Sequence, residues 1–226
     1  MPKKPFTTEE IVAQRQRIMD SASSVMADVG FHHLSMRKLA SQLGMTASNI
    51  YNYFPNKESL FIHTRCRGFE LAFLDINEQL RVGYSPQQGL LSFASNLVVF
   101  AQRFPGYYQL MFQPPLLSLE ESDLADQEVQ YQLGRLVDEW QQHAQTLLVD
   151  AIPELVDQPD SRQKQMTLLV VASLHGLIDT YRHRALPALV AETELISKDM
   201  VASHVASLLV SLRSNLGVQA EPAILS

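Results

Sequence analysis

The segment LASQLGMTASNIYNYFP, residues 39–55, is crowded with neutral hydrogen-bonding side chains and carries no charged one. Arg37 and Lys38 precede it and Lys57 follows it. Amide and hydroxyl groups on an exposed helix can pair with base edges in the major groove of DNA, and flanking cations suit the phosphate backbone. The segment therefore indicates a DNA-reading surface, although helical corners of this kind also occur in proteins that never touch nucleic acid.

Two short helices joined by a glycine turn are predicted to present this surface. Ser35 is the expected N-cap of a helix that runs to Leu43, and Gly44 supplies the tight turn that follows. Thr46 is the expected N-cap of a second helix, which should end at the Phe54–Pro55 step because a proline disfavours helical backbone before it. In such a helix-turn-helix the second helix enters the major groove. The apolar seam of the corner is expected to comprise Leu39, Ala40, Leu43, Met45 and Ile50.

The remainder of the chain has the apolar periodicity of helices and few signals for strands. A capping box of Thr7 and Glu10 opens a first helix that ends at Gly30. Asn56 caps a long helix over 57–82. The first helix, which ends at Gly30, should bury one apolar stripe made of Ile11, Ile18, Ala22, Val25, Met26 and Val29.

Further helices are predicted near residues 87–103, 105–112, 122–150, 161–183 and 193–213. The helix over 161–183 is apolar nearly all round, which predicts burial on two faces. We therefore expect an all-α fold of two domains. We expect residues 1–56 to form a helix-turn-helix DNA-binding domain and residues 57–226 to form a larger helical domain that begins with the linker helix 57–82.

Composition and charge suit a cytoplasmic DNA-binding protein. Of the 226 residues, 46% are hydrophobic and 19% charged, which provides for a sizeable core. The net charge is −6, but residues 1–67 hold nine Lys and Arg against five Asp and Glu, so a basic head precedes an acidic body. A single cysteine predicts a reducing compartment, and neither a secretory signal nor a membrane-spanning run is expected.

The stretch LSMRKLASQLGMTASNIYNYFPNKESLF, residues 34–61, resembles the N-terminal signature of TetR-family transcriptional regulators. The matching anchors are Ser35, Leu39–Ala40, Gly44, Thr46, Ile50–Tyr51, Phe54, Lys57–Glu58 and Leu60, preceded by Val29-Gly30-Phe31. The resemblance implies that the chain contacts a palindromic operator through Ser35, Arg37, Thr46, Ala47, Ser48, Asn49, Tyr51, Asn52, Tyr53 and Lys57. Many members have Lys where Ala47 stands and Gly where Ser48 stands, so base preference does not carry over. The N-terminal arm with Lys3 and Lys4 is either a further electrostatic contact or a solubilising tail.

The same resemblance implies that the C-terminal helices form a homodimer and a pocket for a small-molecule effector. FAQRFPGYYQLMFQ, residues 100–113, and LHGL, residues 174–177, look like the WHG subclass, except that Ala172 or Ser173 stands where tryptophan is expected. Apolar bulk with a few polar groups favours a lipophilic ligand. The candidate pocket residues, which are equally consistent with plain core, are Phe93, Leu97, Phe100, Tyr107, Tyr108, Met111, Phe112, Trp140, His143, His175 and Asp179.

Dimerisation is expected through apolar faces of the last two long helices, joined across a two-fold axis as a four-helix bundle. The candidate interface residues are Leu174, Ile178, Ile196, Met200, Val201, Val205, Leu208, Leu209 and Leu212. Two half-sites of one operator would then be read by two copies of the second helix, about 34–36 Å apart or a multiple of that.

Two other classes of function stay open. The sequence has no Gly-rich phosphate loop, Cys-x-x-Cys, His-Glu-x-x-His or Gly-x-Ser-x-Gly motif, so an enzyme, a cofactor and a metal are not expected. Cys66 lies between Arg65 and Arg67, which would lower its pKa and make it a redox sensor. The second alternative is a helix-turn-helix regulator without a small-molecule ligand.

Overall fold

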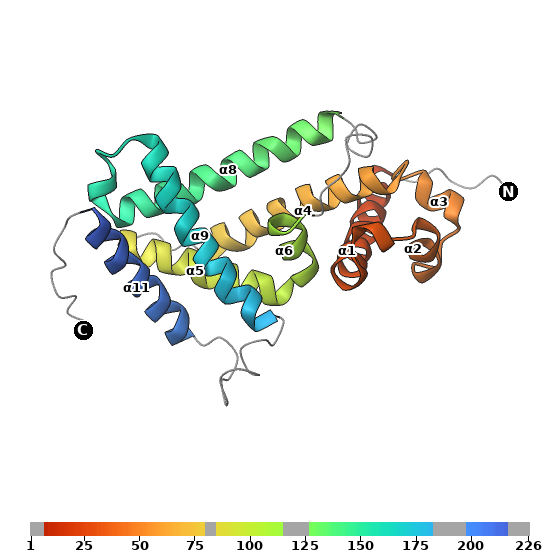
Figure 1. Ribbon diagram of the computed structural model, residues 1–226. Helices are drawn as coiled ribbons and strands as arrows, with labels where there is room; N and C mark the ends of the chain where they lie inside the picture. Colours follow the sequence, from red (N-terminus) through yellow and green to blue (C-terminus); the bar gives the residue numbers. More distant parts are fainter. Residues whose placement is uncertain (1–6, 80–84, 115–126, 183–197, 217–226) are drawn as a thin grey trace. The chain divides into compact units, whose positions relative to one another are not determined.

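The computed structural model describes residues 7–79, 85–114, 127–182 and 198–216, and these are helices and connecting turns with no strand (Figure 1). The all-α prediction is confirmed. The chain divides into two compact units, which we call the first unit (Met1–Phe73 with Arg103–Asp138) and the second unit (Leu74–Gln102 with Glu139–Ser226). Helices α4 and α8 each continue from one unit into the other, and a division at residue 56 remains a prediction.

The first unit begins with α1 (Thr8–Val29), the short turn η1 (Phe31–His33) and the helix pair α2 (Met36–Gln42) and α3 (Ala47–Tyr51). It continues with most of α4 (Lys57–Gln79), α6 (Pro105–Phe112) and the start of α8 (Gln127–Ala151). The predicted caps are confirmed. Thr7 and Glu10 form a capping box, and the Asn56 carboxamide oxygen accepts a hydrogen bond from the Ser59 amide at 2.7 Å. Gly30 ends α1 with φ 83°, a conformation that favours glycine.

The stripe predicted for α1 is only partly correct. Ile18, Ala22 and Met26 are buried as expected, whereas Ile11 and Val29 are exposed. Both exceptions lie near an end of the helix.

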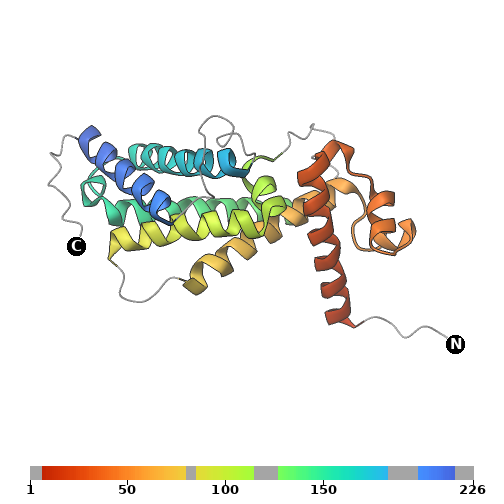
Figure 2. The ribbon, with the colours of Figure 1, turned by 90° about the horizontal axis from the view of Figure 1, so that it is seen from below.

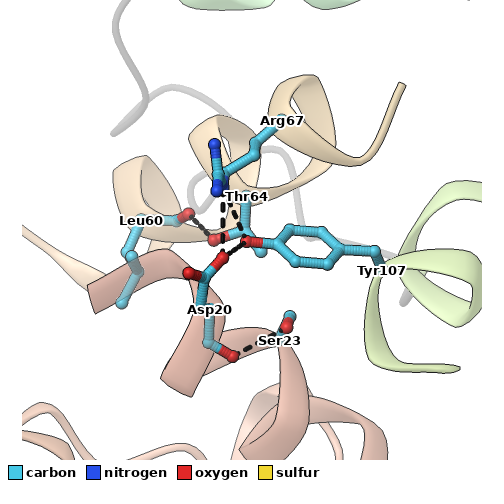
Figure 3. A network of polar contacts seen from close by, with 6 residues as sticks. All are labelled: Asp20, Ser23, Leu60, Thr64, Arg67 and Tyr107. Carbon is cyan, nitrogen blue, oxygen red and sulfur yellow. Dashed lines mark hydrogen bonds and ion pairs between the residues drawn. The ribbon is translucent and has the colours of Figure 1, made fainter. Parts of the chain in front are cut away.

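α1, α4 and α6 are joined by close packing and by a polar network (Figure 3). A Cβ atom added at Gly106 of α6 would lie 2.5 Å from the Ser23 carbonyl oxygen of α1, so the two backbones approach as closely as a glycine permits. Beside this crossing the Tyr107 hydroxyl donates to Asp20 Oδ1 at 2.6 Å. Arg67 Nε of α4 donates to the same oxygen at 3.1 Å and to the Tyr107 hydroxyl at 3.0 Å.

The second unit contains nearly all of α5 (Pro86–Arg103), the end of α8, the turn η2 (Pro153–Leu155), α9 (Asp160–Arg182) and α11 (Lys198–Asn215). In both views α11 lies against α9 (Figure 2), and the Ser173 hydroxyl is 2.9 Å from His204 Nε2 between them. Arg213 of α11 donates to the Ala151 carbonyl at 3.1 Å. Apart from the second helix of the corner, which ends at Tyr51 instead of at the Phe54–Pro55 step, the observed helices agree with the predicted ranges to within two residues. The predicted segments 80–82, 122–126, 183 and 193–197 lie outside the described residues.

The helix crossing at Gly106 generates a stability prediction. Gly106→Ala should lower the free energy of unfolding by about 1–3 kcal/mol, because the new methyl group forces the α1 and α6 backbones apart. Gly134→Ala is the matched control: a Cβ at Gly134 of α8 meets nothing within 4 Å, so this change should raise stability by about 0.5–1 kcal/mol through helix propensity alone. Urea denaturation of both variants measures the difference, and equal effects would contradict the close approach.

Candidate functional site

The corner formed by α2 and α3 is positioned by two capped helices and a left-handed turn. The Ser35 hydroxyl oxygen accepts from the Lys38 amide at 3.4 Å, and the Thr46 hydroxyl oxygen accepts from the Asn49 amide at 3.2 Å. Gly44 has φ 67° between the helices. Within the seam Leu39, Ala40 and Ile50 are buried, and Leu43 and Met45 are half-buried. Side chains predicted as DNA contacts thus also serve as caps: Ser35 and Thr46 fix the helices that carry the others.

The neutral polar side chains lie on the outside of this corner. Ser48, Asn49, Tyr51 and Asn52 are exposed, and Ala47 and Tyr53 are half-buried. The second helix is shorter than predicted, because α3 has five residues and its C-cap is Asn52. Asn52 and Tyr53 therefore stand at the carboxyl end of the helix and just beyond it, where the chain turns toward Pro55.

An open depression beside α3 brings together Arg37 and Lys57, two of the three flanking cations expected to suit phosphates. It is lined by Leu34, Ser35, Met36, Arg37, Tyr51, Pro55, Asn56, Lys57 and Glu58. The first turn of α4 begins here, and a helix N-terminus favours an anion through its free N–H groups and its dipole. Lys57 Nζ lies 4.5 Å from the centre of the Phe31 ring, so its ammonium group is held at the rim by a cation–π contact.

The candidate pocket residues are divided between the two units. Tyr107, Tyr108, Met111 and Phe112 belong to α6 in the first unit, and the others to the second. Buried side chains among these candidates are Phe93, Leu97, Phe100, Tyr107, Tyr108, Met111 and Trp140; Phe112, His143, His175 and Asp179 are half-buried.

Within the second unit the structure brings three candidates into contact. The Phe93 ring centre lies 5.4 Å from that of Trp140 and 5.7 Å from that of His143. Burial lowers the pKa of His143, which favours its neutral form in this aromatic surrounding. The cluster of Phe93, Trp140 and His143 is therefore an apolar region with a neutral imidazole at its edge.

Asn96 is a residue that the sequence reasoning missed. It lies three positions after Phe93 on the buried face of α5 and is 6% exposed, and its amide nitrogen has no hydrogen-bond partner. A buried donor without a partner costs free energy, so native proteins seldom keep one without a use. An asparagine among apolar positions of an amphipathic helix is the signal that could have identified it.

The expectation that Cys66 has a lowered pKa is wrong. Cys66 is buried, with its Sγ atom 3.8 Å from the Val129 carbonyl oxygen. Burial raises the pKa of the thiol to about 12, and Glu70 acts in the same direction. Arg65 lowers it, but too weakly to compensate. A thiol with this pKa is almost entirely protonated near neutral pH and is a poor nucleophile.

Most of the predicted dimer residues are covered within their own chain. Leu174, Ile178, Val201, Val205, Leu209 and Leu212 are buried, Met200 and Leu208 are half-buried, and Ile196 lies outside the described residues. The exposed apolar side chains of α9 and α11 are others: Leu168 at 66%, Leu169 at 51% and Val210 at 49%. The expectation that the 161–183 helix is covered on two faces is therefore wrong for the single chain.

Over the described ranges no helix is both long and apolar enough to cross a membrane. In the same part of the chain, no group of three or more His, Cys, Asp or Glu side chains is arranged to hold a metal ion.

The sequence resembles known regulators of transcription. Residues 18–64 match the family model of bacterial regulatory proteins, tetR family. A helix-turn-helix transcriptional repressor of Mycobacterium tuberculosis is 26% identical over 104 residues, which are 46% of this chain and 50% of that protein. The fatty acid metabolism regulator protein of Bacillus subtilis is 41% identical over 46 residues, which are 20% of this chain and 24% of that protein. The chain thus matches half or less of the length of these relatives.

Solved structures share the fold over nearly the whole chain. The fatty acid degradation regulator FadR of Bacillus halodurans has a TM-score of 0.65 at 16% identity, covering 94% of this chain and 99% of that one. FadR of Bacillus subtilis in complex with stearoyl-CoA has a TM-score of 0.64 at 16% identity, covering 87% and 97%. AibR in complex with isovaleryl coenzyme A and operator DNA has a TM-score of 0.61 at 12% identity, covering 87% and 96%.

Proposed function

We propose, from the match of residues 18–64 to the tetR family of bacterial regulatory proteins, that the protein is a transcriptional repressor of this family. It would bind a palindromic operator as a homodimer and be released by a small lipophilic effector. It would act in the cytoplasm, where the DNA is. The observation that carries the proposal is the row of exposed neutral side chains at Ser48, Asn49 and Asn52 beside a depression lined by Arg37 and Lys57.

The surface carries both groups that suit bases and groups that suit phosphates, which supports recognition of a DNA sequence as well as binding to DNA. Exposed amides such as Asn49 and Asn52 can make paired hydrogen bonds to adenine, whereas Arg37, Tyr51 and Lys57 suit phosphate oxygens. Because phosphate contacts fix only the register, a head with both kinds of group is equipped to distinguish one DNA sequence from another.

A second copy of the chain is the expected occupant of the exposed face of α9 and α11. On α9 the exposed positions Leu168, Leu169, Ala172 and Gly176 follow helical spacing and form one stripe. On α11 Val210 is exposed among small residues, including Ser203, Ala206 and Ser207. Two such helices from each chain can close into a four-helix bundle with two-fold symmetry, which is the symmetry of a palindromic operator. The interface that we propose is thus the outer face of these helices rather than the one predicted from the sequence.

The second unit supports a lipophilic effector with a hydrogen-bond acceptor. Phe93, Trp140 and His143 form an apolar cluster, and Asn96 adds a buried donor on the same helix as Phe93. The solved FadR complex holds stearoyl-CoA and the AibR complex isovaleryl coenzyme A, so acyl thioesters, whose carbonyl oxygen is an acceptor, are the first class to test. The distance between the two helix-turn-helix corners of the dimer would decide whether both fit one operator. An effector that binds better to a dimer with an unsuitable distance would release the DNA, with α4 linking the effector site to the corner.

A regulator without a small-molecule ligand is the second candidate. It is favoured by the complete burial of Leu97, Phe100 and Tyr108, since side chains of this kind also make ordinary core. A thermal-shift series against acyl-CoA esters of different chain lengths separates the two candidates: stabilisation by any of them supports an effector, and none across the series supports the ligand-free regulator.

Selection of bound sequences from a random DNA pool tests the proposal as a whole. The wild-type protein should enrich a palindrome, and Asn49→Ala should lose preference at one position of each half-site, at a cost of about 1–3 kcal/mol per bidentate contact. If the wild type enriches no sequence, the proposed function is wrong. If the wild type enriches a palindrome and the variant enriches the same one equally strongly, Asn49 does not read a base.

Lys57→Ala should behave differently from Asn49→Ala. Removing a phosphate-contacting cation should weaken binding to every sequence and flatten the plot of log affinity against log salt by roughly one unit per chain, while the enriched palindrome stays the same. Titration of fluorescent DNA at several salt concentrations measures this slope. An unchanged slope would mean that the Phe31 contact keeps this ammonium group away from the DNA.

The dimer face is tested by a pair of charge insertions. Leu168→Glu should turn the dimer into monomers and remove cooperative binding to a palindrome, because it buries a carboxylate in the bundle. Val156→Glu is the matched control, since Val156 is similarly exposed at 61% but lies outside α9 and α11. Sedimentation velocity measures both. A Leu168→Glu protein that remains dimeric would place the interface elsewhere.

The effector site is tested at Asn96. Asn96→Leu replaces an amide that lacks a partner with an apolar side chain of similar size, so it should raise the stability of the free protein by about 1–3 kcal/mol. The same change should reduce the thermal shift produced by an acyl-CoA ligand, because the donor is lost. A variant that is more stable but keeps the full ligand shift would show that Asn96 takes no part in binding.

A further inference from the structure

We infer that α1 is part of the DNA-reading device: Arg15 and Arg17 hold the carboxyl ends of α3 and α2 and are positioning residues for the base-reading side chains. The inference rests on the proposed function and names residues that lie outside the helix-turn-helix. It assigns a role to two cations that would otherwise be counted as part of a positive surface.

Both arginines donate to backbone carbonyl groups at the ends of short helices. Arg17 Nη2 donates to the carbonyl oxygen of Leu43, the C-cap of α2, at 3.1 Å. Arg15 Nη1 donates to the carbonyl oxygen of Tyr53, one residue past the C-cap of α3, at 2.5 Å. Gln14, between them and the helix start, donates to Met45 Sδ in the connecting turn at 3.1 Å. Side chains of α1 therefore contact the end of each of the two short helices and the turn that joins them.

These ends need partners because the helices are so short. α2 has seven residues and α3 has five. The last four carbonyl groups of an α-helix receive no hydrogen bond from within the helix. A helix of this length is not stable alone. A cation at the carboxyl end donates hydrogen bonds to the free carbonyl groups and complements the negative end of the helix dipole.

Arg15 is held on three sides, so its orientation is fixed. Its guanidinium carbon lies 4.3 Å from the centre of the buried Phe54 ring. Its Nη2 atom is 3.0 Å from His63 Nε2 of α4. A guanidinium group has only donors, so the His63 nitrogen is the acceptor in this contact. With its N–H groups directed at Tyr53 and His63, Arg15 is placed for structure rather than for a phosphate.

The same helix is anchored independently further along, at Asp20 and Ser23. Five residues after Arg15, Asp20 accepts hydrogen bonds from Tyr107 and Arg67, and Ser23 packs against Gly106 (Figure 3). α1 is fixed at Asp20, and its Arg15 bonds to the Tyr53 carbonyl just after α3. These two attachments restrict the direction in which Asn49 and Asn52 point. Moving a side-chain amide by about 1 Å is enough to lose a directional hydrogen bond to a base. The restriction therefore affects the discrimination between DNA sequences more than the general attraction to DNA.

Hydrogen exchange of the DNA-free protein provides the first test. In Arg15→Gln the amides of Asn52, Tyr53 and Phe54, which donate to the carbonyl groups of Asn49 and Ile50, should exchange about tenfold faster. The rest of α1 and α9 should be unchanged. Arg162→Gln is the matched control, because Arg162 is in the second unit and its side chain donates to Gln165; it should change none of these amides. Unchanged exchange of the three amides in Arg15→Gln would overturn the inference.

Binding to the palindrome enriched by the wild type provides the second test. Arg15→Gln and the milder Arg17→Gln should each lose about tenfold in affinity for that palindrome, keep their affinity for random DNA, and keep the salt slope of the wild type. Arg15→Lys, which keeps the charge but not the forked geometry, should recover only part of the loss.

The outcomes are separable from those of the proposed function. A salt slope that falls by roughly one unit in the Arg15 and Arg17 variants would overturn the inference, because it would make them phosphate contacts. Equal affinity of wild type and variants for the palindrome would overturn it as well. If the wild type enriches no sequence at all, the proposed function fails, and the exchange experiment alone then decides whether α1 holds α3.

Discussion

The reading surface depends on helix ends being satisfied from outside the helices. α2 and α3 are too short to be stable by their own hydrogen bonds, since seven and five residues leave most terminal groups without internal partners. Their amino ends are satisfied locally, by Ser35 and Thr46. Their carboxyl ends are satisfied by α1, a helix from elsewhere in the chain. The side chains that we propose to read bases are therefore as well ordered as the packing of α1 allows.

That packing in turn depends on one small residue. Gly106 lets the α6 backbone reach the carbonyl of Ser23, and this approach brings the Tyr107 hydroxyl to Asp20. Burial and the hydrogen bond to Asp20 both raise the pKa of Tyr107, so it stays protonated and remains a donor over the working range of pH. The position of α1, and through it that of the corner, is set by a backbone contact and two charge-assisted hydrogen bonds.

The sequence predicted those features that are encoded by neighbouring residues. Thr7, Ser35, Thr46 and Asn56 act as caps because a cap needs only a side chain within three residues. Contacts between distant segments could not be predicted in this way: Arg15 and His63 are 48 residues apart. For Cys66 the neighbouring arginines pointed to a low pKa, but burial among residues distant in sequence raised it. The helix over 161–183 was expected to be buried on two faces, and only the packed chain shows that the side chain of Leu168 on this helix is exposed.

The use of cations in the head sets the balance between affinity and specificity. Over residues 7–67, which the structure describes, Arg15, Arg17, Arg65 and Arg67 donate to carbonyl groups, to His63 or to Asp20. The cations that remain for phosphates in this range are Arg37, Lys38 and Lys57. Non-specific affinity grows with the number of phosphates neutralised. A head that bonds most of its arginines within its own chain is therefore suited to weak attraction for DNA in general. Under the proposed function, preference for one operator comes from the neutral side chains whose direction Arg15 and Arg17 fix.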